Sequence, residues 1–286
     1  MSNDSPKSIG LSDGLAPHAT GRTPGPLGVR LPLRVADRMP GVLGRSRPAP
    51  RAPIAAVRFN PANPIASLDS SFTTTEQGKV LAALQVLTDD KLRLNGTDLF
   101  SDGTGKATTS LKAGQMLLRG LQYPTGKVSI VPQTGSFVPD AKPAGTGAIV
   151  EVAFASGDLA TFHFFIITGA NTPGPGGNSV EKSPGYVILA HELIHAYRIL
   201  RGLRVSGARD HQFWDPAGDQ FAERVFLEEL VVVGIDGTEP ITENHIRAEH
   251  GLGTRAAYAS PTVALDKQGV KPVSTPPSWW PDFPTP

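Results

Sequence analysis

The chain contains no cysteine among its 286 residues. Neither a disulfide framework nor a thiolate metal site is therefore possible, and any transition-metal site must be built from His, Asp or Glu. No apolar run approaches the length of about 18 residues that a membrane span needs. The opening stretch, MSNDSPKSIGLSDGLAPHATG, lacks the apolar core of a secretory signal, so we expect no cleaved signal peptide. The formal net charge of +1 gives no reason to expect a nucleic-acid partner.

Proline is concentrated at both ends of the chain. Residues 1–64 hold eleven prolines and eight arginines, so neither a helix nor a strand can extend far there. We predict a disordered, basic segment over 1–64, which is either a solvated linker or a secretion and targeting segment. A folded domain is predicted over 65–262 and a Pro-rich tail over 263–286. Trp279 and Trp280 in this tail are expected to pack on the body or to contact a partner.

Hydrophobic periodicity gives the elements of the body. In the stretch TTTEQGKVLAALQVLTD, apolar residues recur at helical spacing, whereas KVSIVPQ, GAIVEVAFA and TFHFFIITG are β-branched or aromatic runs bounded by Gly, Pro or Asp. Helices before and after a small sheet are typical of the α+β class. We predict helices over 73–89, 111–123, 186–200 and about 219–234, strands over 127–133, 147–155 and 161–169, and a long loop over 170–185. The last two strands are predicted to form a hairpin across SGDL.

The stretch AHELIHAYR, residues 190–198, contains two of the seven histidines. His191 and His195 are four residues apart, so a helix places both imidazoles on one face, opposite the aliphatic stripe that faces the core. Glu192 lies about 100° around the helix from His191. It therefore flanks a metal held by the His pair, where the general base for a metal-activated water is needed. The pattern predicts a zinc site with Glu192 as the base.

A catalytic zinc ion needs a third protein ligand. A third His six residues after His195 would mark a metzincin, but that position is Arg201. A glutamate from a later helix is the gluzincin solution, and Glu228 and Glu229 lie in the apolar stretch FLEELVVVG, where an unpaired carboxylate is costly. Adjacent helical residues point about 100° apart, so one of the pair can bind the metal while the other contacts a neighbour. His211, in RDHQFWDP, is the rival ligand.

These motifs resemble two groups of zinc endopeptidases. HELIH followed by FLEELVVVG resembles the clostridial neurotoxin light chains, which also carry an R-x-x-Y pair. The run of HELIHAY-R, EE-x-x-x-VG and ITEN-x-x-R before R-x-x-Y is more similar to the NleD-like and XopG-like type III secretion effectors. The resemblance covers about residues 185–260 and leaves the first half of the chain unmatched. The light chains are longer, so their substrates do not carry over.

The resemblance implies a role for each matching residue. It selects Glu228 as the third zinc ligand and leaves Glu229 as a neighbour of the metal site. In RAAY, Arg255 and Tyr258 are implied to face the scissile carbonyl as catalytic residues. Glu243, twelve residues before Arg255, is implied to orient a ligand histidine. The alternative is a helix N-terminal residue in a capping stretch begun by Thr242.

We therefore expect a zincin-like fold with one zinc ion per chain and zinc endopeptidase activity. The resemblance implies a monomeric effector, exported by a type III-like route and acting on a host protein, which could be a signalling protein, in the host cytoplasm. One alternative is a module that keeps the zinc fold but binds a host partner without relevant proteolysis. An intact Glu192 argues against that alternative because binding needs no general base. A bacterial housekeeping peptidase is a third possibility.

Overall fold

The computed structural model describes residues 59–105, 112–133, 140–152, 154–155, 158–159, 165–236, 239–258, 263–266 and 269–272. The expectations for residues 1–58 and for the end of the tail, with Trp279 and Trp280, lie outside these ranges. No helix in the described part of the chain has the length and hydrophobicity that a transmembrane segment needs.

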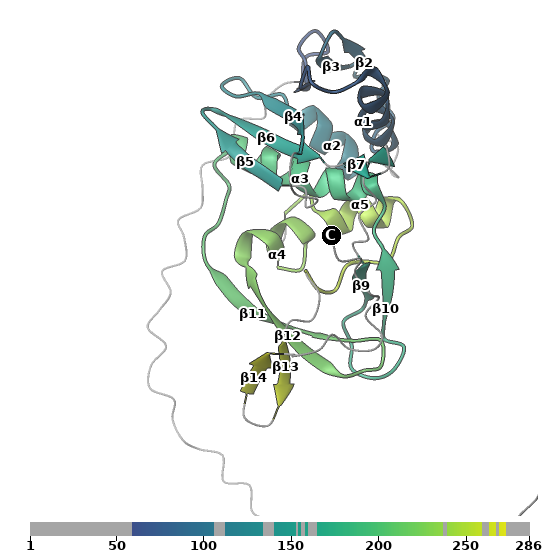
Figure 1. The fold of residues 1–286 in the computed structure, drawn as a ribbon, viewed down its shortest axis with the longest axis vertical. Helices are drawn as coiled ribbons and strands as arrows, with labels where there is room; N and C mark the ends of the chain where they lie inside the picture. Colours follow the sequence, from purple (N-terminus) through teal and green to yellow (C-terminus); the bar gives the residue numbers. More distant parts are fainter. Residues whose placement is uncertain are drawn as a thin grey trace, which may run out of the picture. The chain divides into compact units, whose positions relative to one another are not determined.

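The described residues form an α+β fold (Figure 1), as the sequence predicts. The helices are α1 Thr74–Val86, α2 Lys112–Gly120, α3 Gly185–Leu200, α4 Leu227–Val233 and α5 Glu243–Glu249. The first strands are β1 Ala66–Leu68, β2 Leu92–Asn95, β3 Asp98–Ser101, β4 Val128–Pro132, β5 Asp140–Ala144, β6 Gly147–Val152 and β7 Phe154–Ala155. The later strands are β8 Asp158–Leu159, β9 Phe165–Gly169, β10 Asn178–Lys182, β11 Ala208–Trp214, β12 Gln220–Phe226, β13 Val263–Asp266 and β14 Gly269–Pro272.

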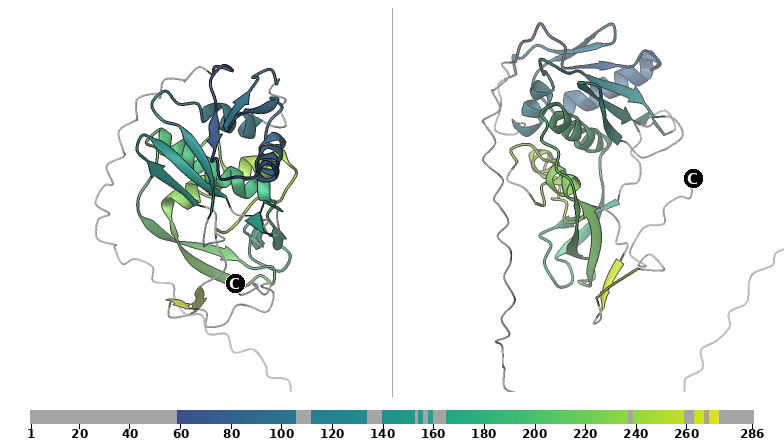
Figure 2. Two further views of the ribbon diagram at one scale, coloured as in Figure 1. Left: turned by 45° about the horizontal axis from the view of Figure 1, so that its top comes forward. Right: turned by 90° about the vertical axis from the view of Figure 1, so that its left-hand side faces the viewer.

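A mixed sheet of six strands, in the order β2-β3-β1-β4-β6-β5, forms the scaffold. Strand β4 runs parallel to β1 and β6, whereas the edge strand β5 is antiparallel to β6. Side chains alternate between buried and partly exposed along β6, which indicates that one face of the sheet is covered. Helices α1, α2 and α3 lie along the sheet in Figure 2, and α3 packs directly on β5 and β6.

Local sequence signals account for the first elements. Thr73 caps α1: its side chain accepts from the Glu76 N–H, and the Glu76 carboxylate accepts from the Thr73 N–H, which is the capping box. Gly96, with φ of 62°, lies in the two-residue turn between β2 and β3. Asn95 and Gly96, at the end of β2 and the start of this turn, form a hairpin signal that the prediction from sequence did not use.

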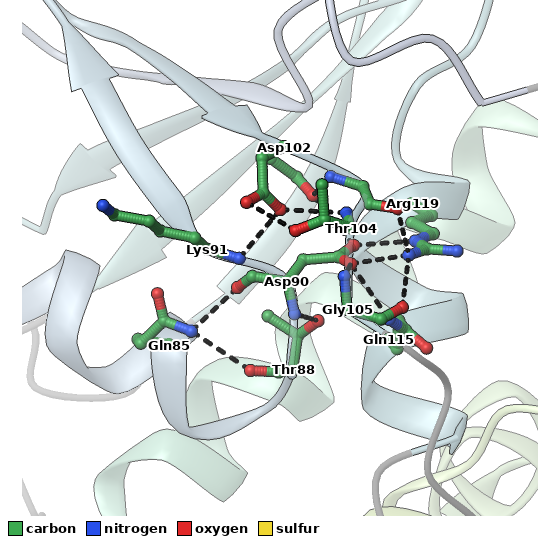
Figure 3. A network of polar contacts seen from close by, with 11 residues as sticks. Gln85, Thr88, Asp90, Lys91, Asp102, Thr104, Gly105, Gln115 and Arg119 are labelled. Atoms are coloured by element: carbon green, nitrogen blue, oxygen red, sulfur yellow. Dashed lines mark hydrogen bonds and ion pairs between the residues drawn. The ribbon is translucent and has the colours of Figure 1, made fainter.

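A buried carboxylate joins the β2–β3 hairpin to α2. Asp90, 1% exposed, accepts a hydrogen bond from Ser101 Oγ (2.8 Å). It also accepts from Gln115 Nε2 (3.0 Å) and Arg119 Nε (2.7 Å), as Figure 3 shows. Burial opposes ionisation of Asp90, but the hydrogen bond from Arg119 and those from Ser101 and Gln115 outweigh it, so the pKa of this carboxyl lies below its ordinary value. The network therefore fixes α2 against the β2–β3 hairpin.

Several expected elements are present and others differ. The helices over 73–89, 111–123 and 186–200 and the strand over 127–133 are confirmed. The expected hairpin between 147–155 and 161–169 is wrong for the described residues, because β6 pairs with β4 and β5 while β9 pairs with β10. Only the short β7–β8 pair spans SGDL. Strand β10 lies within the expected loop 170–185, and β13 and β14 lie within the expected tail.

The largest difference is the helix predicted from about Asp219. Residues Gln220–Phe226 form β12, which pairs along its full length with β11 of the loop-like RDHQFWDP stretch. The turn between them is closed by Asp215, whose carboxylate accepts from the Asp219 N–H (2.7 Å). Glu, Ala and Arg in FAERV favour a helix in isolation, but cross-strand pairing and burial override that preference. Figure 1 shows β11 and β12 as a long ribbon below α4.

Candidate metal centre

Helix α3 carries the paired histidines in the interior of the fold. His191, Glu192 and His195 are each 7–8% exposed, and the two imidazole rings meet edge to face with centroids 4.9 Å apart. The apolar stripe of α3 lies in the main core, and the imidazoles lie on the other side of the helix. Helices α4 and α5 pack on α3 and cover this imidazole face.

Three donor atoms converge at this face. Glu229 Oε2 lies 3.2 Å from His191 Nε2 and 3.0 Å from His195 Nε2, and the two Nε2 atoms are 3.2 Å apart. Metal–ligand bonds of about 2.0–2.1 Å at tetrahedral angles place donors about 3.3 Å from one another. The triangle formed by His191, His195 and Glu229 therefore has dimensions close to those of three zinc ligands.

The geometry exchanges the predicted roles of the adjacent glutamates. Glu228, expected to be the third ligand, turns away from the donor triangle, and Glu229, expected to be its neighbour, takes the position in it. The reason is the orientation of α4. This helix starts directly after β12, so the hydrogen-bonded register of the strand determines which of its first residues faces α3.

Glu228 lies behind His195 and is held by Arg198. Its Oε1 is 3.8 Å from His195 Nδ1, an electrostatic contact too long for a hydrogen bond. Arg198 donates to both carboxylate oxygens, at 2.8 and 3.2 Å, and the Val205 N–H donates to Oε2 at 2.8 Å. Burial opposes ionisation of Glu228, but its contacts with His195 and Arg198 outweigh it and bring the pKa to about 2. Glu228 is thus a fixed anion behind the His195 imidazole.

Glu243 plays the corresponding part behind His191. Its Oε2 lies 2.9 Å from His191 Nδ1 and 2.8 Å from Arg255 NH1. Burial again opposes ionisation, but Arg255, His191 and the fully buried Arg247 outweigh it, so the pKa of Glu243 is about 2. Metal-binding histidines commonly donate their second ring N–H to a carboxylate in this way. Glu243 also begins α5 after the Thr242 cap, so one residue both starts a capped helix and contacts His191.

The paired carboxylates control the charge of the imidazoles. Burial lowers the pKa of His191, but hydrogen bonds with Glu229 and Glu243 outweigh it and raise the pKa to about 10. The pKa of His195 is also raised, because Glu228 and Glu229 outweigh its burial. The carboxylates therefore favour positive charge at these two imidazoles. A site with this strong preference for positive charge suits a divalent metal ion.

Glu192 lies on α3 beside the donor triangle without joining it. Burial raises the pKa of this carboxyl, and the positive imidazoles of His191 and His195 oppose the rise. Asp140, the first residue of β5, is close enough to add to the rise. A general base works best when its pKa lies near the working pH, so an upward shift of the Glu192 pKa towards neutral pH suits this role.

Arg255 and Tyr258 reach the same centre from the irregular segment after α5. The Tyr258 ring centroid is 6.2 Å from that of His191, and the Arg255 guanidinium lies 5.1 Å from the centre of the Tyr258 ring. Burial raises the pKa of Tyr258, and the charge of Glu229 adds to this rise. The phenol thus remains a neutral donor beside Glu229. The structure brings both residues of RAAY to the site, as expected.

His211, the rival ligand, lies elsewhere. Its Nε2 is 2.8 Å from the Ala256 carbonyl oxygen, and it takes no part in the donor cluster found among the described residues.

Comparison with known proteins agrees with this chemistry. Residues 166–258 match the Peptidase_M91 family model, described as "Effector protein". The matched range contains the whole donor cluster, Glu192, Arg255 and Tyr258, and it supports a peptidase related to this effector family. The matched range does not include the six-stranded sheet, whose strands all lie before residue 166 in the sequence. Comparisons with curated proteins and with solved structures found no match.

Sequence reasoning missed the arginines that hold the carboxylates. Arg198 is three residues after His195, so it shares a helix face with His191 and His195, and this spacing was the available signal. Arg247 is four residues after Glu243 and completely buried. Its Nε donates to the Gly253 carbonyl at 2.6 Å. The i, i+4 spacing from Glu243 was the available signal for Arg247, but its pairing with Glu181 and its burial depend on the tertiary fold.

Proposed function

We propose that this chain is a zinc-dependent endopeptidase that a bacterium exports into a host cell, where it cleaves a host protein. One observation carries the proposal: His191, His195 and Glu229 form a buried triangle of donors with edges of 3.0–3.2 Å, beside an intact Glu192. The resemblance of residues 166–258 to an effector peptidase family supports the same conclusion. The proposed stoichiometry is one zinc ion per monomer.

Each residue of the site has a task in peptide hydrolysis. A bound zinc ion would supply Lewis acidity, which lowers the pKa of a water molecule and polarises a carbonyl group. Glu192 takes a proton from the attacking water and passes it to the leaving amine. Tyr258, neutral and beside Glu229, donates a hydrogen bond to the oxyanion that develops on the substrate. Arg255 adds positive charge near the same oxygen and fixes Glu243.

The edge strand β5 offers a place for an extended substrate. It packs on α3, and its first residue, Asp140, lies close enough to Glu192 to affect its pKa. Its side chains are largely exposed, and its outer edge has no partner strand among the described residues. A peptide that adds to this edge would lie along the active-site helix and gain main-chain hydrogen bonds.

The test compares wild type with Glu192→Gln, a variant of nearly equal size without the base. Both are loaded with zinc, checked for about one zinc ion per chain, and added to plant and animal cell lysates, in which new protein N-termini are sequenced. We expect termini that appear only with wild type, and these would name the substrate and its cleavage site. Zinc-loaded wild type that produces no new termini would contradict proteolysis and favour the alternative, a host-protein-binding module.

A further inference from the structure

The segment that carries Arg255 and Tyr258 has almost no regular structure of its own. Residues 251–258 follow α5 without forming a helix or strand, apart from a single bridge between Arg255 and Thr168. Groups that stabilise a transition state must be held closely, because a misplacement of about 1 Å can cost about a hundredfold in rate. Contacts with other elements must therefore hold this segment in place.

Polar side chains from other elements hold the backbone of the segment at residues 255, 256 and 258. Asn244 brackets Arg255: its Oδ1 accepts from the Arg255 N–H at 2.6 Å, and its Nδ2 donates to the Arg255 carbonyl at 3.1 Å. His211 Nε2 donates to the Ala256 carbonyl at 2.8 Å. Glu223 Oε1 accepts from the Tyr258 N–H at 2.7 Å. The segment thus has tethers on both sides of its two central alanines.

Two of these tethers form a pair on the β11–β12 ribbon. His211 and Glu223 face each other directly in the ladder, and they are only 8% and 2% exposed. Burying a carboxylate is costly unless it accepts strong hydrogen bonds, so Glu223 is an unusual choice for a position inside a ribbon. The metal-site chemistry described above does not use either residue.

Apolar packing fixes the centre of the segment to the same ribbon. Ala256 and Ala257 belong to a small buried cluster with Ile167, Phe213 and Phe221, separate from the main core. Phe213 and Phe221 lie on β11 and β12, and their rings stack with centroids 5.9 Å apart. The Ala256 N–H also donates to the Ile167 carbonyl at 2.8 Å. Side chains as small as alanine allow the backbone to lie close against this cluster.

We infer that Glu223 and His211 are positioning residues, which place Tyr258 and Arg255 at the reaction centre by holding the backbone of the RAAY segment. Strand β12 continues directly into α4, so the ribbon that carries Glu223 also delivers Glu229 to the metal site. One ribbon therefore sets the spacing between the third ligand and the phenol. The inference deepens the proposed function and rests on it only for the catalytic consequence, because the tethering can be tested separately.

The first test measures backbone hydrogen exchange in the zinc-loaded full-length protein. Glu223→Ala and His211→Ala should speed amide exchange within residues 254–258 by about tenfold or more, because each removes a buried hydrogen bond. Exchange in α3 and the zinc content should not change. Glu223→Gln, which keeps an oxygen acceptor, should restore most of the protection, and the exposed Arg224→Ala on the same ribbon should have no effect.

The second test uses the substrate identified from new N-termini. Glu223→Ala should lower kcat with little change in KM, as expected when only transition-state contacts are lost. Glu223→Gln should recover most of the rate. Unchanged exchange at 254–258 in Glu223→Ala, or an equal rise throughout α3, would overturn the inference and leave Glu223 a general structural role. If wild type cleaves nothing, the proposed function fails, but the exchange experiment still decides whether the ribbon holds the segment.

Discussion

At the scale of single residues, the two adjacent glutamates of α4 have different relations to the metal site. Glu229 shares the donor triangle with both imidazoles. Glu228 lies behind His195, with its Oε1 3.8 Å from His195 Nδ1, and its negative charge is balanced by an ion pair with Arg198. Removing a ligand should weaken metal binding more than removing a carboxylate that only orients a ligand. Outer carboxylates of this kind typically contribute about tenfold to a hundredfold in affinity.

We predict that Glu228→Ala lowers zinc affinity by about tenfold to a hundredfold, and that Glu229→Ala lowers it further. Competition with a chromophoric chelator measures both constants, and Glu239→Ala serves as a control because Glu239 contacts Arg198 only at the exposed end of the network. The opposite order, with Glu228→Ala the more damaging change, would restore the assignment implied by the resemblance.

The difference between these neighbours explains how far the sequence could predict the site. His191, Glu192 and His195 lie within one turn of one helix, so their spacing fixes their geometry without knowledge of any other element. The choice between Glu228 and Glu229 depends on how α4 is rotated against α3, which is a tertiary property. The identification of Arg255, Tyr258 and Glu243 depended on the family resemblance, because nothing in a single RxxY links it to a helix more than fifty residues away.

At the scale of elements, Arg198 joins the end of α3 to the start of α4. It is 3% exposed, pairs through both carboxylate oxygens with Glu228, and donates to the Leu203 carbonyl at 2.8 Å. Replacing it would leave the Glu228 carboxylate buried without its cation. Breaking a buried pair in this way costs about 3–5 kcal/mol.

Arg198→Ala should therefore lower the free energy of unfolding of the metal-free protein by about 3–5 kcal/mol, measured by urea denaturation. Arg224→Ala is the matched control, because Arg224 and its partner Asp210 are 68% and 55% exposed. An exposed pair contributes about 1 kcal/mol or less. A loss in Arg198→Ala no greater than in the control would show that the buried pair does not stabilise the α3–α4 contact.

Element prediction failed where cross-strand pairing and burial outweigh the helix preference of the residues. The segment FAERV contains good helix formers, yet it forms β12 because Phe221 and Val225 are buried on the ribbon while Arg224 remains exposed. The turn DPAGD before it was a usable signal for the β11–β12 hairpin. Helix α3, by contrast, was predictable because its apolar residues repeat at helical spacing over many turns, whatever packs against it.

At the scale of the whole molecule, the buried cluster of histidine and glutamate side chains makes stability depend on pH. The folded pKa of His191 is raised from 6.5 to about 10, so the unfolded chain releases this proton first as pH rises. Its contribution to stability is complete below pH 6.5 and is lost as pH rises towards about 10. Glu228 and Glu243 have folded pKa values of about 2 against 4.5. Their contribution is complete above pH 4.5 and is lost as pH falls towards about 2.

The metal-free protein should therefore be most stable between about pH 4.5 and 6.5 and should lose stability above that range. Zinc competes with protons for the same imidazole nitrogens, so it should stabilise the protein increasingly from pH 6 to 8. Melting temperatures measured across this range, with zinc or with a chelator, should diverge as pH rises. His191→Gln should reduce the alkaline decline of the metal-free protein. A metal-free melting temperature that stays constant from pH 6.5 to 9 would mean that the carboxylates do not hold the imidazoles in their protonated form.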